Sequence, residues 1–503
     1  MTLTENPRGP LPGPSHPTAP ERAGRREWTA LAVLMLPLLL VSMDVSVLYF
    51  ALPAIAAELR PGATAQLWIL DMYGFVLAGL LITMGALGDR IGRRRLLLGG
   101  AALFGAASVA AALATSPGTL IAARALLGVG GACLMPSTLA MIRTMFRDAA
   151  QRAKAVTLWT TVMASGISLG PVLSGALLDH FWWGSVFLVN LPAMALLLIV
   201  GPALLPAAPG TGRRHGRFDL LSAVLSLGAV LPTVYGVKEF AKNGFAAGPA
   251  LAVAAGLVVG ALFLRRQTRL AHPMVDLGLL RRPAYGGSVL VNLLAMAATV
   301  GFAVFLTQYL QSVLGQSAFE AALWSLVPAV GVMAAAPTAA ALAQKLPRAY
   351  VMAGGFLVSA AGFGWLATTE LTTPLWVVLT GCACYAAGLV SAMTLGNELA
   401  LGAAPADRAG AAAAVLESGQ ELGGALGMAL LGSLGTAVYT AAMPATAPAA
   451  ARETLTGALT APAPVLEAAK SAFVDSLGAA AAGSALLMLL ASALSYGLLR
   501  RRA

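Results

Sequence analysis

Apolar stretches of about 20 residues recur along the whole chain, and each is long enough to cross the hydrocarbon core of a bilayer as a helix. Of the 503 residues, 58% are hydrophobic and only 11% are charged, and the mean hydropathy is +0.80. Soluble domains do not have this composition. The chain is therefore predicted to be an all-α integral membrane protein with many spanning helices.

Windows of this length predict fourteen helices, at residues 29–56, 66–88, 96–114, 119–142, 154–178, 183–206, 218–238, 247–266, 285–312, 320–343, 349–368, 374–398, 408–440 and 474–499. An even number of spans places both chain ends on the same side of the membrane. The distribution of basic residues indicates which side that is, because cytoplasmic loops are rich in lysine and arginine.

With both termini in the cytoplasm, the inner segments hold 26 of the 32 basic residues. Arg124 falls within a predicted helix, and the outer segments hold only Arg60, Lys238, Lys242, Arg452 and Lys470. The same bias explains the net charge of +11 without a nucleic-acid partner. We predict a multi-pass protein of the cell (plasma) membrane with both termini cytoplasmic.

Residues 1–28 are rich in proline and polar side chains and predict a disordered cytoplasmic tail. A secretory signal peptide is the rival interpretation, but the apolar run that follows is too long for one and carries Asp44. Near the other end, residues 441–473 form a long extracellular segment with two weakly amphipathic pieces. A small helical flap and a flexible Ala/Pro linker are both open for this segment.

A charged, glycine-punctuated turn follows the second predicted helix, at residues 85–95. The stretch 86–100 aligns with residues 341–355 at an offset of 255 positions, and each copy follows the second helix of a six-helix set. Chance similarity between segments rich in alanine and glycine is the alternative. The repeat predicts an N-terminal six-helix bundle at 29–206, a linker with inserted helices 7 and 8 at 207–284, and a C-terminal six-helix bundle at 285–503.

No motif indicates catalysis. The sequence has no Gly-x-x-x-x-Gly-Lys-[Ser/Thr] segment for a nucleotide, and its four histidines are scattered. Cys133, Cys382 and Cys384 lie in apolar stretches and are interpreted as packing residues rather than as disulfide partners or metal ligands. We predict a protein that is not an enzyme and that holds no metal and no cofactor.

Four acidic residues lie inside predicted helices: Asp44, Asp71, Glu417 and Glu421. A charged side chain within the bilayer is costly and usually serves a pathway. Glu417 and Glu421 are four residues apart, so they share one helical face, where two negative charges disfavour each other. We interpret all four as candidates for proton coupling and substrate binding. The alternative is a structural ion pair or a side chain that reaches water, which we favour for Glu398 near an inner helix end.

Arg124 lies inside the fourth predicted helix, where an unpaired guanidinium would be very unfavourable. A carboxylate partner is expected, and hydrogen bonds to backbone carbonyls are the alternative. Trp68, Tyr73 and Trp159 are candidate aromatic contacts for a cationic substrate, because ring faces attract cations. For Trp68, near an outer helix end, a residue of the interfacial aromatic belt is the favoured interpretation.

Small residues shape two further motifs. Asp89 can form a cytoplasmic latch with Arg90 and Arg93, and Gly88 and Gly92 permit the tight turn. Surface pairs of this kind contribute only about 0–1 kcal/mol each, which suits a gate that opens in every cycle.

In the fifth predicted helix, Gly166, Gly170 and Ser174 recur every four residues and form a face that lets another helix approach closely. Pro171 in the same helix removes a backbone donor and favours a kink. Close packing alone is one interpretation of this face.

These motifs resemble the major facilitator superfamily and, within it, the fourteen-helix drug:proton antiporters that include quaternary-ammonium and multidrug efflux pumps. The likeness covers residues 29–499. The motifs that carry it are the cytoplasmic gate motif (Gly85, Gly88, Asp89, Arg90, Gly92, Arg93), the helix 4 motif (Arg124, Gly128, Gly130, Gly131), the antiporter motif (Gly166, Gly170, Pro171, Gly175), Met43-Asp44 with Ala51-Leu-Pro53, Gln66 to Tyr73, and Gln308 to Gln311 with Gly315.

Two departures from the family pattern stand out. Ser174 occupies the position of a usual glycine, and the range 320–343 has no acidic residue beyond Glu320, whereas some relatives carry one there. The second departure leaves the range of substrate charge open.

The resemblance implies a major facilitator fold in which two six-helix bundles alternate access to a site near the midplane. It implies that Asp44 pairs with Arg124, and that the helix 5 face seals the two halves together. The expected activity is proton-coupled efflux of small lipophilic cationic compounds, with the proton gradient as energy source, lipid as surroundings and a monomer as the working unit. A dedicated exporter of one endogenous metabolite or antibiotic is the alternative, and a non-transporting sensor or a uniporter is a more distant rival.

Overall fold

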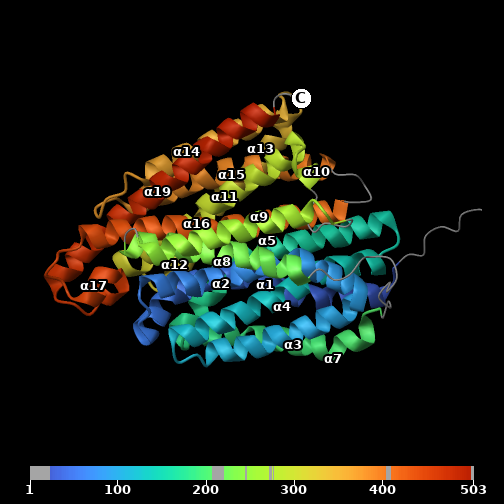
Figure 1. Cartoon of the computed structure of the whole chain (residues 1–503), viewed down its shortest axis with the longest axis horizontal. Helices are drawn as coiled ribbons and strands as arrows, with labels where there is room; N and C mark the ends of the chain where they lie inside the picture. The colour runs from blue at the N-terminus through green and yellow to red at the C-terminus, as the bar shows by residue number, and fades with distance from the viewer. Residues whose placement is uncertain are drawn as a thin grey trace, which may run out of the picture.

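A computed structural model of the chain describes residues 23–206, 220–243, 246–270, 275, 277–403 and 409–499. All regular structure in these residues is helical (Figure 1). Most of the predicted N-terminal tail and part of the predicted linker at 207–284 lie outside the described residues.

The helices of the first part of the chain are α1 (Arg25–Leu59), α2 (Ala63–Ile91), α3 (Arg93–Ala112), α4 (Pro117–Met145), α5 (Ala149–His180), α6 (Ser185–Leu188), α7 (Asn190–Leu204), α8 (Leu220–Asn243), α9 (Ala247–Gln267) and α10 (Leu277–Leu280). They are followed by α11 (Pro283–Gln308), the π-helical turn η1 (Tyr309–Val313), α12 (Ala318–Trp324), α13 (Val327–Ala343), α14 (Arg348–Leu366), α15 (Leu375–Ala403), α16 (Ala409–Ala442), α17 (Ala449–Glu453), α18 (Leu455–Ala458) and α19 (Ala463–Leu499).

Each predicted range overlaps one of these helices or two consecutive ones. Within the described residues, eleven helices are long and apolar enough to cross a membrane, so the chain is a multi-pass membrane protein. The three predicted spans that are not among the eleven correspond to α5, α8 and the α12–α13 pair. The count of fourteen spans therefore stays a prediction.

The helices pack as two groups with the same internal pattern. In the N-terminal group α1 packs on α5 and α7, α2 on α4, and α3 on α4 and α7. In the C-terminal group α11 packs on α16 and α19, α13 on α15, and α14 on α15 and α19. The two patterns match when α1, α2, α3, α4, α5 and α7 are paired with α11, α13, α14, α15, α16 and α19 in that order. Repetition of the same packing supports the internal repeat.

Individual residues 255 positions apart also occupy equivalent places in the two groups. α3 begins at Arg93 and α14 begins at Arg348, 255 positions later. A Cβ on Gly100 would lie 2.5 Å from Cβ of Cys133 in α4, and a Cβ on Gly355 would lie 2.8 Å from the carbonyl oxygen of Gly388 in α15. The preceding glycine of each copy has no neighbour within 4 Å of that position. The aligned glycine pairs therefore serve equivalent helix contacts.

These glycine pairs provide a matched test of the repeat. Gly100→Ala and Gly355→Ala are expected to lower the melting temperature of the purified protein, since overpacking a tight contact costs about 1–3 kcal/mol. Gly99→Ala and Gly354→Ala are expected to be neutral or to stabilise by up to about 1 kcal/mol, because alanine favours a helix over glycine. The equivalence would be contradicted if Gly99→Ala destabilised the protein as much as Gly100→Ala, or Gly354→Ala as much as Gly355→Ala.

The two ends of the molecule are named by their connections. We call the end with the α1–α2 connection the loop-1 face and the end with the α2–α3 connection the loop-2 face. In Figure 1 the loop-1 face, with α17, lies at the left, and the loop-2 face, with α10, lies at the right. The sequence predicts that the loop-1 face is extracellular.

The two groups contact each other through α2 with α16 and through α5 with α12. Near the loop-1 face, Nε2 of Gln311 donates to the carbonyl oxygen of Phe50 at 3.4 Å, and Gly175 lies against the backbone of Phe319. The groups are thus closed against each other at the loop-1 face, and in Figure 1 they diverge toward the loop-2 face.

Helices α8 and α9 form a hairpin outside this contact. α8 packs on both α2 and α16, and the Ser226 hydroxyl donates to the carbonyl oxygen of Gly79 at 3.3 Å. α9 presents large apolar side chains outward: Leu251, Leu257 and Val258 are 70%, 63% and 60% exposed. An outer helix with this surface fits contact with lipid rather than with water.

The segment 443–462, which we call the cap segment, contains the short helices α17 and α18 at the loop-1 face. The Tyr439 hydroxyl of α16 donates to the carbonyl oxygen of Ala451 at 2.8 Å and holds the cap segment in place. Of the two interpretations of residues 441–473, the helical flap fits the structure. The second predicted amphipathic piece belongs to α19, which begins at Ala463.

Candidate functional site

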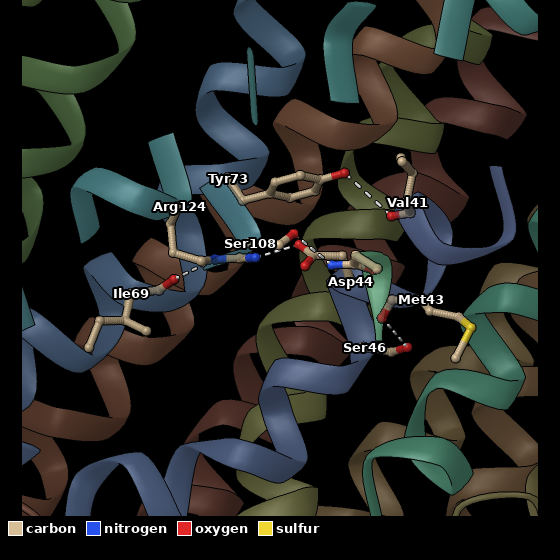
Figure 2. A network of polar contacts seen from close by, with 9 residues as sticks. Val41, Met43, Asp44, Ser46, Ile69, Tyr73, Ser108 and Arg124 are labelled. Carbon is tan, nitrogen blue, oxygen red and sulfur yellow. Dashed lines mark hydrogen bonds and ion pairs between the residues drawn. The ribbon is translucent and has the colours of Figure 1, made fainter. Parts of the chain in front are cut away.

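Asp44 of α1 and Arg124 of α4 form a buried ion pair between Oδ2 and Nη1 (Figure 2). The two residues are 6% and 1% exposed. Nε of Arg124 also donates to the carbonyl oxygen of Ile69 in α2 at 3.1 Å. Both expected partners of the guanidinium, a carboxylate and a backbone carbonyl, are therefore present, and the predicted pair of Asp44 with Arg124 is confirmed.

Tyr73 of α2 covers the other side of this guanidinium. Its ring centroid lies 4.8 Å from Cζ of Arg124, and its hydroxyl donates to the carbonyl oxygen of Val41 at 3.3 Å (Figure 2). A cation above a ring face is stabilised by the charge distribution of the ring. Tyr73 thus contacts Arg124, although its sequence position also suggested a contact with substrate.

The helix 4 glycines make room for Tyr73. A Cβ on Gly128 would lie 2.8 Å from the carbonyl oxygen of Tyr73, and a Cβ on Gly131 would lie 3.0 Å from its hydroxyl oxygen. Gly130 faces the opposite neighbour, α3, where a Cβ would lie 2.9 Å from Cβ of Phe104. These small residues let α4 carry Arg124 into tight contact with α2.

Glu421 of α16 brings a carboxylate of the C-terminal group to the same region. It lies one helical turn before Ala425, whose Cβ would be 3.6 Å from a Cβ on Gly74 of α2, the residue next to Tyr73. Asp71 is 2% exposed. Asp44 pairs with Arg124, and Asp71 and Glu421 lie on α2 and α16, which pack against each other. We call these three carboxylates with Arg124 the acid cluster. When all are ionised, negative charge exceeds positive charge there.

Glu417 lies one helical turn from Glu421, toward the loop-2 face. The two carboxylates interact with each other. Oε1 of Glu417 is buried and accepts no hydrogen bond from any residue that the structure describes. A buried charge without such partners is costly.

The small-residue face of α5 packs within the N-terminal group. A Cβ on Gly166 would lie 2.7 Å from the carbonyl oxygen of Leu39, and the Ser174 hydroxyl donates to the carbonyl oxygen of Val47 at 3.0 Å. Gly170 likewise lies against Met43 and Ser46 of α1. The partner of these three residues is α1 of the same group, which supports the interpretation of close packing, and the seal between the halves stays a prediction.

Gly175 is the member of the antiporter motif that reaches the C-terminal group. A Cβ there would lie 2.5 Å from Cα of Phe319 in α12. Pro171 lies inside α5, which continues as a helix on both sides of it.

The two candidate tryptophans lie elsewhere. Trp68 packs near Phe75, with ring centroids 6.2 Å apart, in a cluster with Val234 of α8 and Ala425 of α16. Trp159 is buried, and its Nε1 donates to the Thr138 hydroxyl of α4 at 3.1 Å. Each contact supports the packing of helices, and a role in substrate contact stays a prediction.

The loop 2–3 turn has the backbone that its glycines predict. Gly92 has φ 100°, in the region that favours glycine, and it ends α2 and precedes α3. A Cβ on Gly88 would lie 2.9 Å from Cδ of Arg93, and one on Gly85 would lie 3.8 Å from Pro136. Arg90 is exposed. The side chain of Asp89 lies outside the described residues, so the latch stays a prediction.

Glu398 forms a surface ion pair with Arg348 at 3.7 Å, and the two side chains are 54% and 50% exposed. The structural interpretation of Glu398 is therefore supported. Glu398→Gln is expected to leave transport unchanged and to alter stability by no more than about 1 kcal/mol, the range for exposed pairs. Transport assays in vesicles check this, and a large loss of transport would contradict it.

Sequence reasoning missed a neutral polar cluster in the C-terminal group. Nε2 of Gln420 donates to Oδ1 of Asn397 at 3.1 Å and to Oδ1 of Asn292 at 3.4 Å. The buried Tyr49 of α1 was also not among the candidate residues. Amides within apolar stretches were the available signal for the cluster, because polar side chains in spanning helices seek one another.

Comparisons with known proteins agree with this architecture. The family model described as Major Facilitator Superfamily matches residues 34–428 and 288–499. The chain is 41% identical over 486 residues to the multidrug efflux pump LfrA of Mycolicibacterium smegmatis, with 94% of this chain and 96% of LfrA covered. It is 34% identical over 481 residues to the methyl viologen resistance protein SmvA of Salmonella typhimurium, with 92% and 97% covered.

Among solved structures, a bacterial homolog of the human lysosomal transporter Spinster, in an inward-facing and unoccupied conformation, matches with a TM-score of 0.67. The match covers 95% of this chain and 98% of the other at 18% identity. At that identity the likeness shows the fold alone.

Proposed function

The chain belongs to the Major Facilitator Superfamily, as a drug efflux transporter of the cell membrane and not an enzyme, and we propose that it exchanges protons for lipophilic cations. The observation that carries this proposal is the acid cluster: the α16 segment with Glu421 packs against α2 beside Tyr73, whose ring contacts Arg124 of the buried Asp44–Arg124 pair. The acid cluster thus holds carboxylates of both groups. Protonation or cation binding there can therefore change the contacts of both groups at once.

The proposed exchange is a competition for negative charge. With the carboxylates ionised, the acid cluster attracts an organic cation that enters from the cytoplasm. Protons that arrive from outside neutralise Glu417 and Glu421, the cation is released outward, and loss of the protons to the cytoplasm restores its affinity. Binding of a proton by Asp44 would break its pair with Arg124, and release of that proton would restore the pair. Substrate affinity is therefore expected to fall as the pH falls.

The proposed architecture is two six-helix halves that alternate around the acid cluster, with α8 and α9 as an inserted pair and fourteen spans in all. We place the loop-2 face in the cytoplasm, because it carries the arginine-rich connections. Closure at the loop-1 face then corresponds to an inward-facing state. We propose that the protein works as a monomer in lipid without a cofactor.

The proton gradient supplies enough energy for this exchange. One charge moving through 100 mV contributes roughly 2.3 kcal/mol, and each pH unit contributes about 1.4 kcal/mol. Exchange of one proton for one monovalent cation would cancel the voltage contribution. Two or more protons for each cation would retain it.

Vesicles that contain the purified protein test the proposal. With an acidic lumen and inverted protein, ethidium is expected to accumulate inside, and a protonophore is expected to release it. Methyl viologen, a dication, tests how much substrate charge the site accepts. Absence of pH-driven movement for both cations would contradict the proposal, and transport of one compound from a broad panel would favour the dedicated exporter.

A further inference from the structure

A cavity lies between the two groups near the loop-1 face. The space between the lining atoms, counted together with the open solvent at its mouth, is about 580 Å³. α1 and α2 line one side, α11, α16 and α19 line the other, and the cap segment lines the mouth. The cavity therefore exists only while the groups are closed at this face.

Glu453, the last residue of α17, supplies the carboxylate of this cavity. Its Oε2 lies so near the start of α2 that a Cβ on Gly62 would be 2.8 Å away. Within the described residues no basic side chain forms an ion pair with it, and its basic sequence neighbour Arg452 and nearby Arg60 are both exposed. The carboxylate of Glu453 is stabilised by the positive N-terminal end of the α2 dipole. Because this is only a partial charge, the carboxylate can also bind a cation.

The remaining walls suit an aromatic cation. Phe305 and Phe473 line the cavity with ring centroids 6.1 Å apart. Gln308 and Thr436 add uncharged polar groups beside them. Rings, a carboxylate and a few polar side chains together are the surroundings that bind organic cations.

The cavity follows the acid cluster along the helices. Gln66, in its wall, lies five residues from Asp71 on α2, and Met428 lies seven residues from Glu421 on α16. At about 1.5 Å per residue, these separations are roughly 7 to 10 Å. A cation that leaves the acid cluster toward the loop-1 face thus reaches this cavity next.

We propose that this cavity is a second binding site for lipophilic organic cations, with Glu453 as the counter-ion. That this cavity is the last binding site before release rests on the proposed function. That it binds organic cations does not. The site joins residues of both groups with the cap segment, so opening of the loop-1 face disassembles it and frees the cation.

Equilibrium binding of ethidium to the purified full-length protein tests the site. The wild type is expected to show two classes of site, and Glu453→Gln is expected to weaken one of them by roughly tenfold or more, the loss for removing a charged partner. Glu467→Gln is the matched control, because this glutamate has a 69% exposed side chain near the same face and is paired with Lys470 at 3.9 Å. It is expected to bind ethidium as the wild type does.

The double variant Glu417→Gln/Glu421→Gln separates the two sites. It is expected to lose the other class of binding and to keep the class that depends on Glu453, even if pH-driven transport proves absent. Wild-type binding by Glu453→Gln, or equal weakening by Glu467→Gln, would overturn the second site.

A lower melting temperature of Glu453→Gln would indicate a structural role for this carboxylate at the start of α2. Thr436→Leu then decides the question, since it fills the cavity and leaves Glu453 unchanged. Loss of the same class of binding in Thr436→Leu supports the site, and unchanged binding in that variant refutes it.

Discussion

Asp44→Asn is expected to abolish transport and to lower the free energy of unfolding by about 3–5 kcal/mol, the usual cost of removing one partner from a buried ion pair. Arg124 is 1% exposed and would keep its charge, with the carbonyl of Ile69 and the ring of Tyr73 as its remaining partners. Ethidium transport in vesicles and the melting temperature of the purified protein measure the two effects.

Removal of both charges is the control for Asp44. The double variant Asp44→Asn/Arg124→Gln has no buried unpaired charge, so it is expected to recover part of the lost stability and none of the transport. Wild-type transport by Asp44→Asn would show that the pair only supports the fold.

Glu417→Gln with Glu421→Gln is expected to abolish pH-driven transport with the opposite effect on stability. Glutamine has the size of glutamate but carries no charge, so the cost of burying a charged carboxylate at Glu417, whose Oε1 has no hydrogen-bond partner among the described residues, disappears. The melting temperature is therefore expected to stay the same or to rise while transport is lost. Transport and melting are measured on the same protein preparation.

Glu467→Gln is the control for this pair too, since it removes one exposed negative charge far along the chain from the acid cluster. It is expected to transport as the wild type does. If the double glutamine variant still drives ethidium with a pH gradient, proton coupling resides elsewhere. A loss of stability in Asp44→Asn together with no loss in Glu417→Gln/Glu421→Gln would also distinguish the ion-paired Asp44 from the two glutamates.

The fold could be predicted where its cause is local in sequence. Each spanning helix needs about 20 apolar residues, so the helix ranges follow from the sequence alone. The need of Arg124 for a partner also follows from its position inside an apolar stretch. The repeat was visible because Arg93 and Arg348 begin equivalent helices at one offset.

The site depended on packing that no local pattern contains. Spacing of Gly166, Gly170 and Ser174 predicts that some helix approaches α5, but both α1 and the other half satisfy that pattern equally. Likewise, an acidic residue in an apolar helix indicates function but does not identify its neighbours, so the packing of α16, which carries Glu421, against α2 required the structure. The position of Trp68 against α8 depends on an inserted hairpin that has no counterpart in the repeat.

Proton release from the purified protein on addition of ethidium tests the central claim most directly. In a weakly buffered solution near neutral pH, ethidium binding is expected to release protons from the wild-type protein. The variant Glu417→Gln/Glu421→Gln is expected to release none under the same conditions. Ethidium binding without proton release in the wild type, or equal release in the double variant, would contradict the exchange of protons and substrate at these carboxylates.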